Sequence, residues 1–414
     1  MSILVINAGS TSLKFALFDA AARECVMSGS MDWIGGGREH AELTLRADGR
    51  EEVRRQDDVP DHRAAAARAI QFASDRGPIT AVGHRVVYGG VEINRSVLID
   101  NRVRGIIARY GELAPLHNPP ALAAIEGATT ALPHAPQVAV FDTAFFAELP
   151  PRAFIYPVPY EWYEKWGVRR FGFHGISIDY CVRRSAELLG GDADKRRVVV
   201  CHLGGGCSAA AARGGRAVAT TLGFSTLEGL MMTTRCGSMD PGLLIHMQRR
   251  CGLTLDEISD ALTNRSGLLG VSGVSPSLSQ VEAAARQGNE RARLAFDMFA
   301  DRVRSAVGSL TVTLGGLDAL IFSGGMSEIS PGLRAAVCDG LECLGAHLDA
   351  ERNATCKPDA GLATANSPVR ILLIRTREDL VIAQETKRIA AAENSQSQVP
   401  YSKEAPRTNP QARF

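Results

Sequence analysis

Two segments of the chain, residues 3–18 and 197–213, repeat one design. In each, an apolar β-branched run leads into a turn of small residues and then into a second strand-like run. Small turn residues let backbone N–H groups approach an anionic oxygen with no Cβ in the way. The duplication therefore predicts two related α/β halves, each offering a phosphate-binding hairpin to a shared cleft.

The length of 414 residues and an apolar content of 45% predict a globular protein of two domains. The composition shifts to Pro, Tyr and Trp over 149–166, which marks the boundary. We expect an N-terminal domain over 1–148 and a C-terminal domain over 149–377. A last helix, 378–391, is expected to pack back on the first domain and to precede a disordered Ser/Gln/Pro tail over 392–414.

Charge and cysteine usage exclude several classes of protein. A formal net charge of +1 without a dense Lys/Arg stripe argues against nucleic acid as a partner. Nine scattered cysteines with no Cys-x-x-Cys pair indicate neither a disulfide framework nor a zinc knuckle. The first residues lack a basic segment, and no apolar run reaches the roughly 18 residues of a membrane span. We therefore expect a cytoplasmic protein with no membrane partner.

Hydrophobic periodicity and turn residues predict the main elements. Helices are expected over 61–76, from 118, over 176–189, over 241–250, from 254 and over 289–314, and strands over 79–87, 137–141, 319–323 and 369–374. Two capping boxes are predicted, Thr254-x-x-Glu257 and Ser277-x-x-Gln280.

Several side chains suit phosphoryl transfer, which relies on positioning and charge stabilisation. Lys14 could reach a terminal phosphate or face solvent from a strand edge. Asn7 could hold a metal-bound water or serve as a turn residue. Arg85 and Arg235, each near a glycine, could clamp a carboxylate and a phosphoryl group, although a single arginine is more often a surface residue. Asp142 follows a buried strand, where α/β sheets place ligands.

Other signals exclude neighbouring mechanisms. The chain has no Gly-x-x-x-x-Gly-Lys-Ser/Thr loop, so a P-loop enzyme is excluded. The spacing of the histidines matches no metal motif; these are His84, His117, His174 and His202.

Taken together, the ordered motifs resemble the acetate kinase family over residues 1–391. The segments that carry the resemblance are 5–14, 83–87, 114–120, 140–146, 170–175, 227–235 and 376–380. The resemblance implies a fold of two duplicated actin-like (ribonuclease H-like) domains with a cleft between them. It also implies a homodimer built on the second domain.

The family's activity is reversible, Mg²⁺-dependent transfer of the ATP γ-phosphate to acetate by direct in-line attack, giving acetyl phosphate and ADP. By resemblance, Arg85 and Arg235 bind the carboxylate and the phosphoryl group in flight, and His174 adds a donor in the transition state. Asp142 acts on the acceptor or through the metal. A carboxylate oxygen is already an adequate nucleophile at pH 7, so clustered cations matter more than a strong base.

The remaining roles are also implied by the resemblance. Asn7 and Glu378 organise Mg²⁺ (or Mn²⁺), and Lys14 faces the nucleotide phosphates. Val87, Leu116 and Phe173 form a small apolar pocket for the acyl methyl group. The nucleotide-binding segments are His202, Leu203, Gly204, Gly205 and Gly206, and Gly324, Gly325, Met326, Ser327 and Glu328.

The sequence departs from the family mainly on the donor side. Gly205 replaces an asparagine, Ser277 and Ser279 replace an aspartate and an arginine near the adenosine, and Ser327 and Ile329 replace a glycine and an asparagine. Near the acyl site, Thr226 replaces a proline and Ser238 an aspartate. Two alternatives therefore stay open beside an acetate kinase. One is a short-chain acyl kinase that uses propionate or an altered donor, such as pyrophosphate or another nucleotide, and the other is a non-catalytic actin-like binding or regulatory protein.

Overall fold

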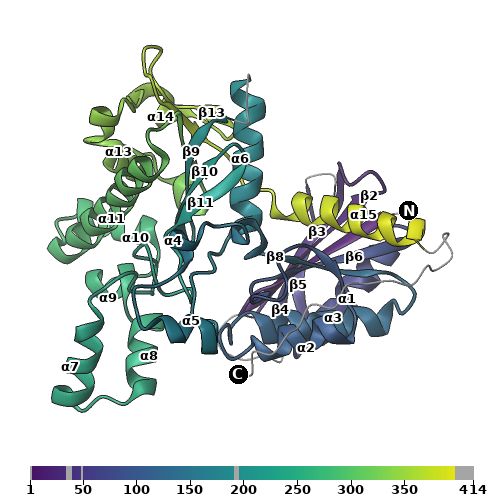
Figure 1. Cartoon of the computed structure of the whole chain (residues 1–414). Helices are drawn as coiled ribbons and strands as arrows, with labels where there is room; N and C mark the ends of the chain where they lie inside the picture. The colour runs from purple at the N-terminus through teal and green to yellow at the C-terminus, as the bar shows by residue number, and fades with distance from the viewer. Residues whose placement is uncertain (1, 34–39, 48–49, 191–194, 397–414) are drawn as a thin grey trace. The chain divides into compact units, whose positions relative to one another are not determined.

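The computed structural model describes residues 2–33, 40–47, 50–190 and 195–396 (Figure 1). The chain divides into two compact units. The first comprises the chain up to Ala147, Glu164–Gly167 and the chain from Arg377 onward, and the second comprises Glu148–Tyr163 and Val168–Thr376. Each unit is built on a sheet of its own.

The first unit contains an eight-stranded sheet in the order β5-β4-β3-β2-β1-β6-β8-β7. Its strands are β1 (Ser2–Ala8), β2 (Ser12–Asp19), β3 (Cys25–Asp32), β4 (His40–Ala47), β5 (Arg50–Asp58), β6 (Ile79–Val86), β7 (Val97–Leu98) and β8 (Gln137–Phe141). β1 and β2 form the first predicted hairpin, with Asn7 opposite Lys14. β6 runs parallel to β1 and β8 parallel to β6, so the carboxyl ends of these three strands lie at one edge of the sheet.

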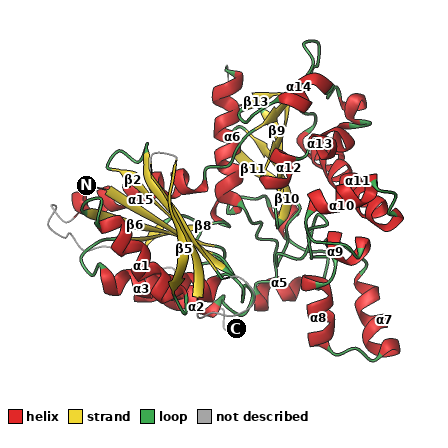
Figure 2. Cartoon of the chain, turned by 180° about the vertical axis from the view of Figure 1, so that it is seen from behind, coloured by secondary structure: helices red, strands yellow, loops and turns green. Residues whose placement is uncertain are grey.

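Helices cover both faces of this sheet. They are α1 (His62–Ser74), α2 (Asn101–Arg109), α3 (Asn118–Ala131) and α15 (Glu378–Gln396), with a 3₁₀ turn, η1 (Ala144–Phe146). α1 begins where the Asp61 side chain accepts the backbone N–H of Ala64, as an N-cap does. α15 packs against β6, β1 and β8 on the face opposite α1 and α3 (Figures 1 and 2).

The second unit repeats this topology in a six-stranded sheet of order β11-β10-β9-β12-β14-β13. Its strands are β9 (Arg197–Leu203), β10 (Cys207–Arg213), β11 (Arg216–Thr220), β12 (Ala319–Ser323), β13 (Ala360–Gly361) and β14 (Arg370–Leu373). Three antiparallel strands, β9 to β11, are followed in the sheet by β12 and β14 parallel to β9 and by an antiparallel last strand, β13. The order β3-β2-β1-β6-β8-β7 has the same directions, which confirms the duplicated α/β fold.

The second unit also contains helices, only some of which pack on its sheet. They are α4 (Pro151–Phe154), α5 (Tyr160–Trp166, which crosses the division between the units), α6 (Gly175–Leu189), α7 (Pro241–Cys251), α8 (Leu255–Asn264), α9 (Gly267–Ser272), α10 (Leu278–Arg286), α11 (Glu290–Leu314), α12 (Gly325–Ile329), α13 (Pro331–Cys338), η3 (Leu341–Leu344) and α14 (Ala350–Thr355). α11 packs on β9, β10 and β11, and α6 packs on β9 and β12. The predicted helix over 289–314 is confirmed as α11, capped by Asn289.

The two predicted capping boxes have different outcomes. The Thr254 box at the start of α8 is confirmed, since the Thr254 side chain and the Glu257 side chain each bind the other's backbone N–H. The Ser277 box is wrong. Ser277 stands at the N-cap of α10 but makes no capping hydrogen bond, because its hydroxyl pairs with that of Ser279 at 2.9 Å.

The C-terminal helix is longer than the sequence suggested. α15 continues to Gln396, so the first residues of the expected tail are helical, and residues 397–414 lie outside the described part of the chain. Among the described residues, no helix combines the length and the apolar character needed to cross a membrane. Each of the nine cysteines is a free thiol.

Candidate active site

In the first unit, four predicted site residues meet at the carboxyl ends of the parallel strands. Arg85 near the end of β6 donates to Asp142, just past β8, from Nη2 at 2.7 Å and from Nε at 3.1 Å. The Asn7 side chain on β1 lies 3.3 Å from Arg85 Nη1 and 3.4 Å from the Glu378 carboxylate at the start of α15. Glu378 is also 3.8 Å from Arg85 Nε. The topology therefore gathers these residues from widely separated segments.

The charge of this cluster is dominated by carboxylates. The Arg85 side chain is 17% exposed and that of Asp142 is 1% exposed. Burial opposes the charge of Arg85, but the attraction of Asp142 and Glu378 and the hydrogen bonds to Asp142 outweigh it and raise the arginine pKa. Arg85 therefore stays charged and is matched to two carboxylates. Asp142, expected to act on the acceptor or through the metal, forms an ion pair with Arg85 in this structure.

In the second unit, His174 and Arg235 converge over the turn between β9 and β10. A Cβ placed on Gly206 would lie 3.1 Å from His174 Nε2 and 3.8 Å from Arg235 Nη1. Any side chain at Gly206 would therefore press on the imidazole. The His174 ring also lies 4.7 Å from the ring of His202, which stands at the end of β9.

The geometry of His174 is unusual for a non-glycine residue. Its φ of 59° places it in the left-handed region at the start of α6. Its Nδ1 lies 2.9 Å from the Ser208 hydroxyl, which is fully buried on β10. Ser208 was missed in the sequence, and the signal available was a single serine in a strand of alanines.

Arg235 differs from Arg85 in having no carboxylate within ion-pair distance among the described residues. The one hydrogen bond of its side chain there is from Nη1 to the carbonyl of Thr226 at 3.4 Å. Burial lowers the pKa of Arg235 from its ordinary value, with the Cys207 thiol opposing this. A desolvated guanidinium without a counter-ion binds an anion strongly, because its charge is poorly solvated and unneutralised.

An ion pair between Arg170 and Glu228, which the sequence did not predict, connects the segments that hold His174 and Arg235. Arg170 donates to Glu228 at 2.6 Å and to the Thr221 carbonyl at 2.9 Å. Tyr156 donates to the same glutamate. Arg170 belongs to the segment before His174 and Glu228 to the segment before Arg235, so this pair fixes both backbones.

The two glycine turns expected at the nucleotide phosphates lie side by side. β9 and β12 are parallel neighbours, with His202 opposite Ser323. Gly324 has a φ of +86°, and a Cβ on it would lie 2.6 Å from the Leu203 carbonyl. Only glycine fits this close approach.

The substituted donor-side positions differ in their surroundings. A Cβ on Gly205 would meet nothing within 4 Å, so the missing asparagine leaves open space. Ser327 is fully buried, and within the described chain its hydroxyl has no hydrogen-bond partner. Ile329 is 64% exposed. Near Arg235, the Ser238 hydroxyl accepts the backbone N–H of Gly229 at 3.0 Å.

The remaining predicted residues fall in both units. Lys14 is exposed on β2, and Leu116, also in the first unit, is 44% exposed. Val87 is buried in the first unit and Phe173 in the second. In the second unit, Met326 is buried, and Glu328 pairs with Arg375 at 3.0 Å.

Comparison with known proteins gives one consistent family. The sequence model of the acetokinase family matches residues 2–384. The acetate kinase of Trichormus variabilis is 44% identical over 401 residues, covering 93% of this chain and 98% of that protein. The structure of Porphyromonas gingivalis acetate kinase superimposes with a TM-score of 0.86 at 37% identity, covering 94% and 99% of the two chains. A propionate kinase from Francisella tularensis superimposes with a TM-score of 0.87 at 34% identity and the same coverage.

Proposed function

Because the chain belongs to the acetokinase family, we propose that it is an acetate kinase, which transfers the γ-phosphoryl group of ATP to acetate. The observation that carries this proposal is the convergence over Gly206 of His174 and Arg235, whose guanidinium forms no ion pair with any described residue. Two cationic or donor groups beside a glycine turn suit a phosphoryl group whose charge is spread over three oxygens.

In the proposed reaction, a carboxylate oxygen of acetate attacks the γ-phosphorus. A new P–O bond forms to acetate while the bond from phosphorus to the ADP oxygen breaks. Arg235 neutralises the oxygens in flight, His174 donates to them, and Arg85 binds the carboxylate. Ser208 holds His174 through Nδ1 and so keeps Nε2 above Gly206.

Mg²⁺ belongs to the proposal and would be held by Asn7 and Glu378. Among the described residues, no group of three or more His, Cys, Asp or Glu side chains is arranged as a metal site. Mg²⁺ does not require one, since it retains several waters and is bound by one or two carboxylates together with substrate phosphates. The Asn7 amide nitrogen donates to the Glu378 carboxylate at 3.4 Å, and the amide oxygen accepts from Arg85 Nη1 at 3.3 Å. The carboxylate and amide oxygens are of the ligand type that Mg²⁺ takes. The ion would offset the charge of the phosphates.

The identity of the phosphoryl donor is the part of the proposal for which the sequence changes suggest alternatives to ATP. The open space at Gly205 and the hydroxyl pair Ser277–Ser279 remove an amide and two charged groups from the nucleotide side. These changes favour a test of GTP and pyrophosphate beside ATP, and of propionate beside acetate.

One assay tests these alternatives. Acyl phosphate is trapped as the hydroxamate, with acetate or propionate as acceptor and ATP, GTP or pyrophosphate as donor. Turnover with ATP and acetate is expected. Folded protein that forms no product with any donor would leave the non-catalytic alternative standing, and faster turnover with pyrophosphate would replace ATP as the donor.

The finer expectations are proposals as well. We place the enzyme in the cytoplasm as a homodimer, with domains over 1–148 and 149–377. Cross-linking and light scattering of the purified chain test the dimer, and a monomer at micromolar concentration would contradict it.

A further inference from the structure

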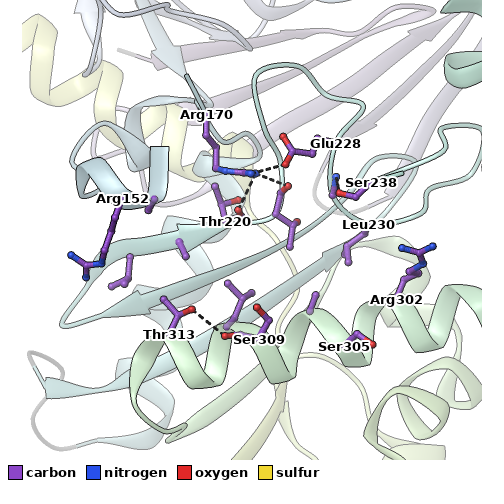
Figure 3. Close-up of a pocket in the computed structure, with 17 residues that line it drawn as sticks. Arg152, Arg170, Thr220, Glu228, Leu230, Ser238, Arg302, Ser305, Ser309 and Thr313 are labelled. Carbon is purple, nitrogen blue, oxygen red and sulfur yellow. Dashed lines mark hydrogen bonds and ion pairs between the residues drawn. The ribbon is translucent and has the colours of Figure 1, made fainter. Parts of the chain in front are cut away.

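A pocket of about 840 Å³ lies within the second unit, apart from the residues proposed for phosphoryl transfer. Its walls come from α4, β11, the segment 228–230 and one face of α11 (Figure 3). None of the residues assigned above to acetate, ATP or Mg²⁺ lines it. Its volume is in the range of sites for small organic ligands.

The lining is positively charged. It contains three arginines and a single carboxylate, Glu228, which is already paired with Arg170 at 2.6 Å. Arg152 and Arg302 are exposed and form no ion pair within the described part of the chain. They lie at opposite ends of the pocket (Figure 3). Two unneutralised guanidinium groups favour an anionic occupant, because each can bind two oxygens of a carboxylate or phosphate.

Hydroxyl groups lie between the two arginines. Ser305 and Ser309 follow Arg302 at helical spacing and occupy the same face of α11. Thr220 lines the pocket from β11 and is 7% exposed, and its Oγ1 has no hydrogen-bond partner among the described residues. A buried hydroxyl without a partner costs free energy, which a ligand with polar groups would recover.

The pocket also shares a wall with the catalytic segments. Arg170, which lines it, donates to the carbonyls of Thr220, Thr221 and Leu222 and to Glu228. The chain runs from Arg170 to His174 and from Glu228 to Arg235 within a few residues. A ligand that rearranges this wall would therefore act on both segments.

We propose that this pocket binds a small metabolite with an anionic group at each end and polar groups between them, and that its occupancy alters turnover. Sugar bisphosphates and hydroxydicarboxylates belong to this class. The site goes beyond the proposed transfer reaction and uses none of its residues.

Isothermal titration of the full chain with fructose 1,6-bisphosphate and with malate tests the binding. ADP and acetate are present throughout to fill the sites of the proposed reaction. At least one probe is expected to bind with a Kd below 1 mM, and fructose, which lacks charge, is expected not to bind. Arg152→Ala and Arg302→Ala should each raise Kd about tenfold or more, a loss of about 1.4 kcal/mol.

Arg293→Ala is the matched control, because Arg293 is exposed on α11 and lies outside the pocket. It should leave Kd unchanged. Binding by neither probe, or equal binding by Arg302→Ala and wild type, would overturn the site. A change of oligomeric state in Arg152→Ala or Arg302→Ala would overturn it too, since the pocket would then belong to an interface between copies.

The hydroxamate assay tests the effect on turnover separately. Without a probe, the two pocket variants should match the wild-type rate, which keeps this test independent of the proposed function. A saturating probe should change the wild-type rate at least twofold and leave the rate of the Arg152→Ala/Arg302→Ala double variant unchanged. An unchanged wild-type rate despite binding would refute the regulatory part.

Discussion

At the scale of single residues, the two candidate substrate arginines differ in how they are neutralised. Arg85 is held by Asp142 and lies close to Glu378, whereas the Arg235 side chain has only the Thr226 carbonyl as a partner among the described residues. Binding an anion at Arg85 means competing with carboxylates already in place. Arg235 has no such competitor in the described chain, so it should contribute more of the transition-state stabilisation.

We therefore predict that Arg235→Ala lowers kcat about a hundredfold to a thousandfold, the usual loss when one donor to a developing charge is removed. The fold should be retained, because Arg235 forms no ion pair in the described chain. Steady-state kinetics and circular dichroism measure both effects. Arg249→Ala, an exposed arginine on α7, serves as the control, and near-normal kcat in Arg235→Ala would refute the assigned role.

Ser208 gives a prediction about positioning. Removing its hydroxyl in Ser208→Ala takes one hydrogen-bond partner from His174 Nδ1, so the orientation of the ring above Gly206 is less constrained. We expect kcat to fall up to about tenfold and stability to fall by about 1 kcal/mol. Ser185→Ala is the matched control, since Ser185 is also buried and donates to the Val182 carbonyl on α6. It should lose similar stability and keep kcat, and equal kcat values for the two variants would contradict the role of Ser208.

At the scale of elements, the two glycine turns of the donor side differ in whether they can accommodate a side chain. Gly324→Ala combines a φ of +86° with a Cβ only 2.6 Å from the Leu203 carbonyl. It should cost about 1–3 kcal/mol and raise the KM for ATP, with little change in the KM for acetate. Gly205→Ala places its Cβ in open space and should change neither value. Thermal unfolding and kinetics compare the two variants, and a larger defect in Gly205→Ala would refute this account.

The sequence was sufficient for elements whose signals are local. Repeated strand patterns predicted both hairpins, and helical periodicity with Asn289 at its start predicted α11. Prediction from the sequence failed where a nearby group competes for the same atom. The Ser277 hydroxyl pairs with the Ser279 hydroxyl and does not cap the backbone of α10. Prediction from the sequence also missed Ser208 and the Arg170–Glu228 pair, because their roles depend on partners 34 and 58 residues away.

At the scale of the whole molecule, the two units share a sheet topology but have different residues at the ends of the corresponding strands. In the first sheet the strand next to the hairpin ends in Arg85-Val86, and in the second it ends at Ser323, which Gly324 follows. The first copy thus presents charged side chains and the second presents backbone. The two units share a sheet order, and the residues at the ends of their strands distinguish them.

The acid stability of the molecule should depend on a buried histidine in the first of these sheets. His84 on β6 is 1% exposed, and its Nε2 lies 2.8 Å from the Gln137 side chain. Burial lowers its pKa from 6.5 to about 4, against the opposing effect of the hydrogen bond that Nε2 donates to the Gln137 side-chain oxygen, with Arg104 adding to the decrease. Between these two pH values the unfolded chain binds a proton that the folded chain does not. The contribution of His84 to the unfolding free energy is therefore fully present above about pH 6.5 and is lost as the pH falls toward 4.

The pKa difference corresponds to about 3 kcal/mol of unfolding free energy lost across this interval. Urea unfolding at pH 7.5, 6, 5 and 4 measures the loss. His84→Gln removes the titrating group, so it should be less stable than wild type at pH 7.5 yet lose less stability on acidification. His134→Gln, at an exposed position outside the buried core, should keep the wild-type pH dependence. Parallel pH profiles for wild type and His84→Gln would show that carboxylates, and not His84, set the acid limit of the fold.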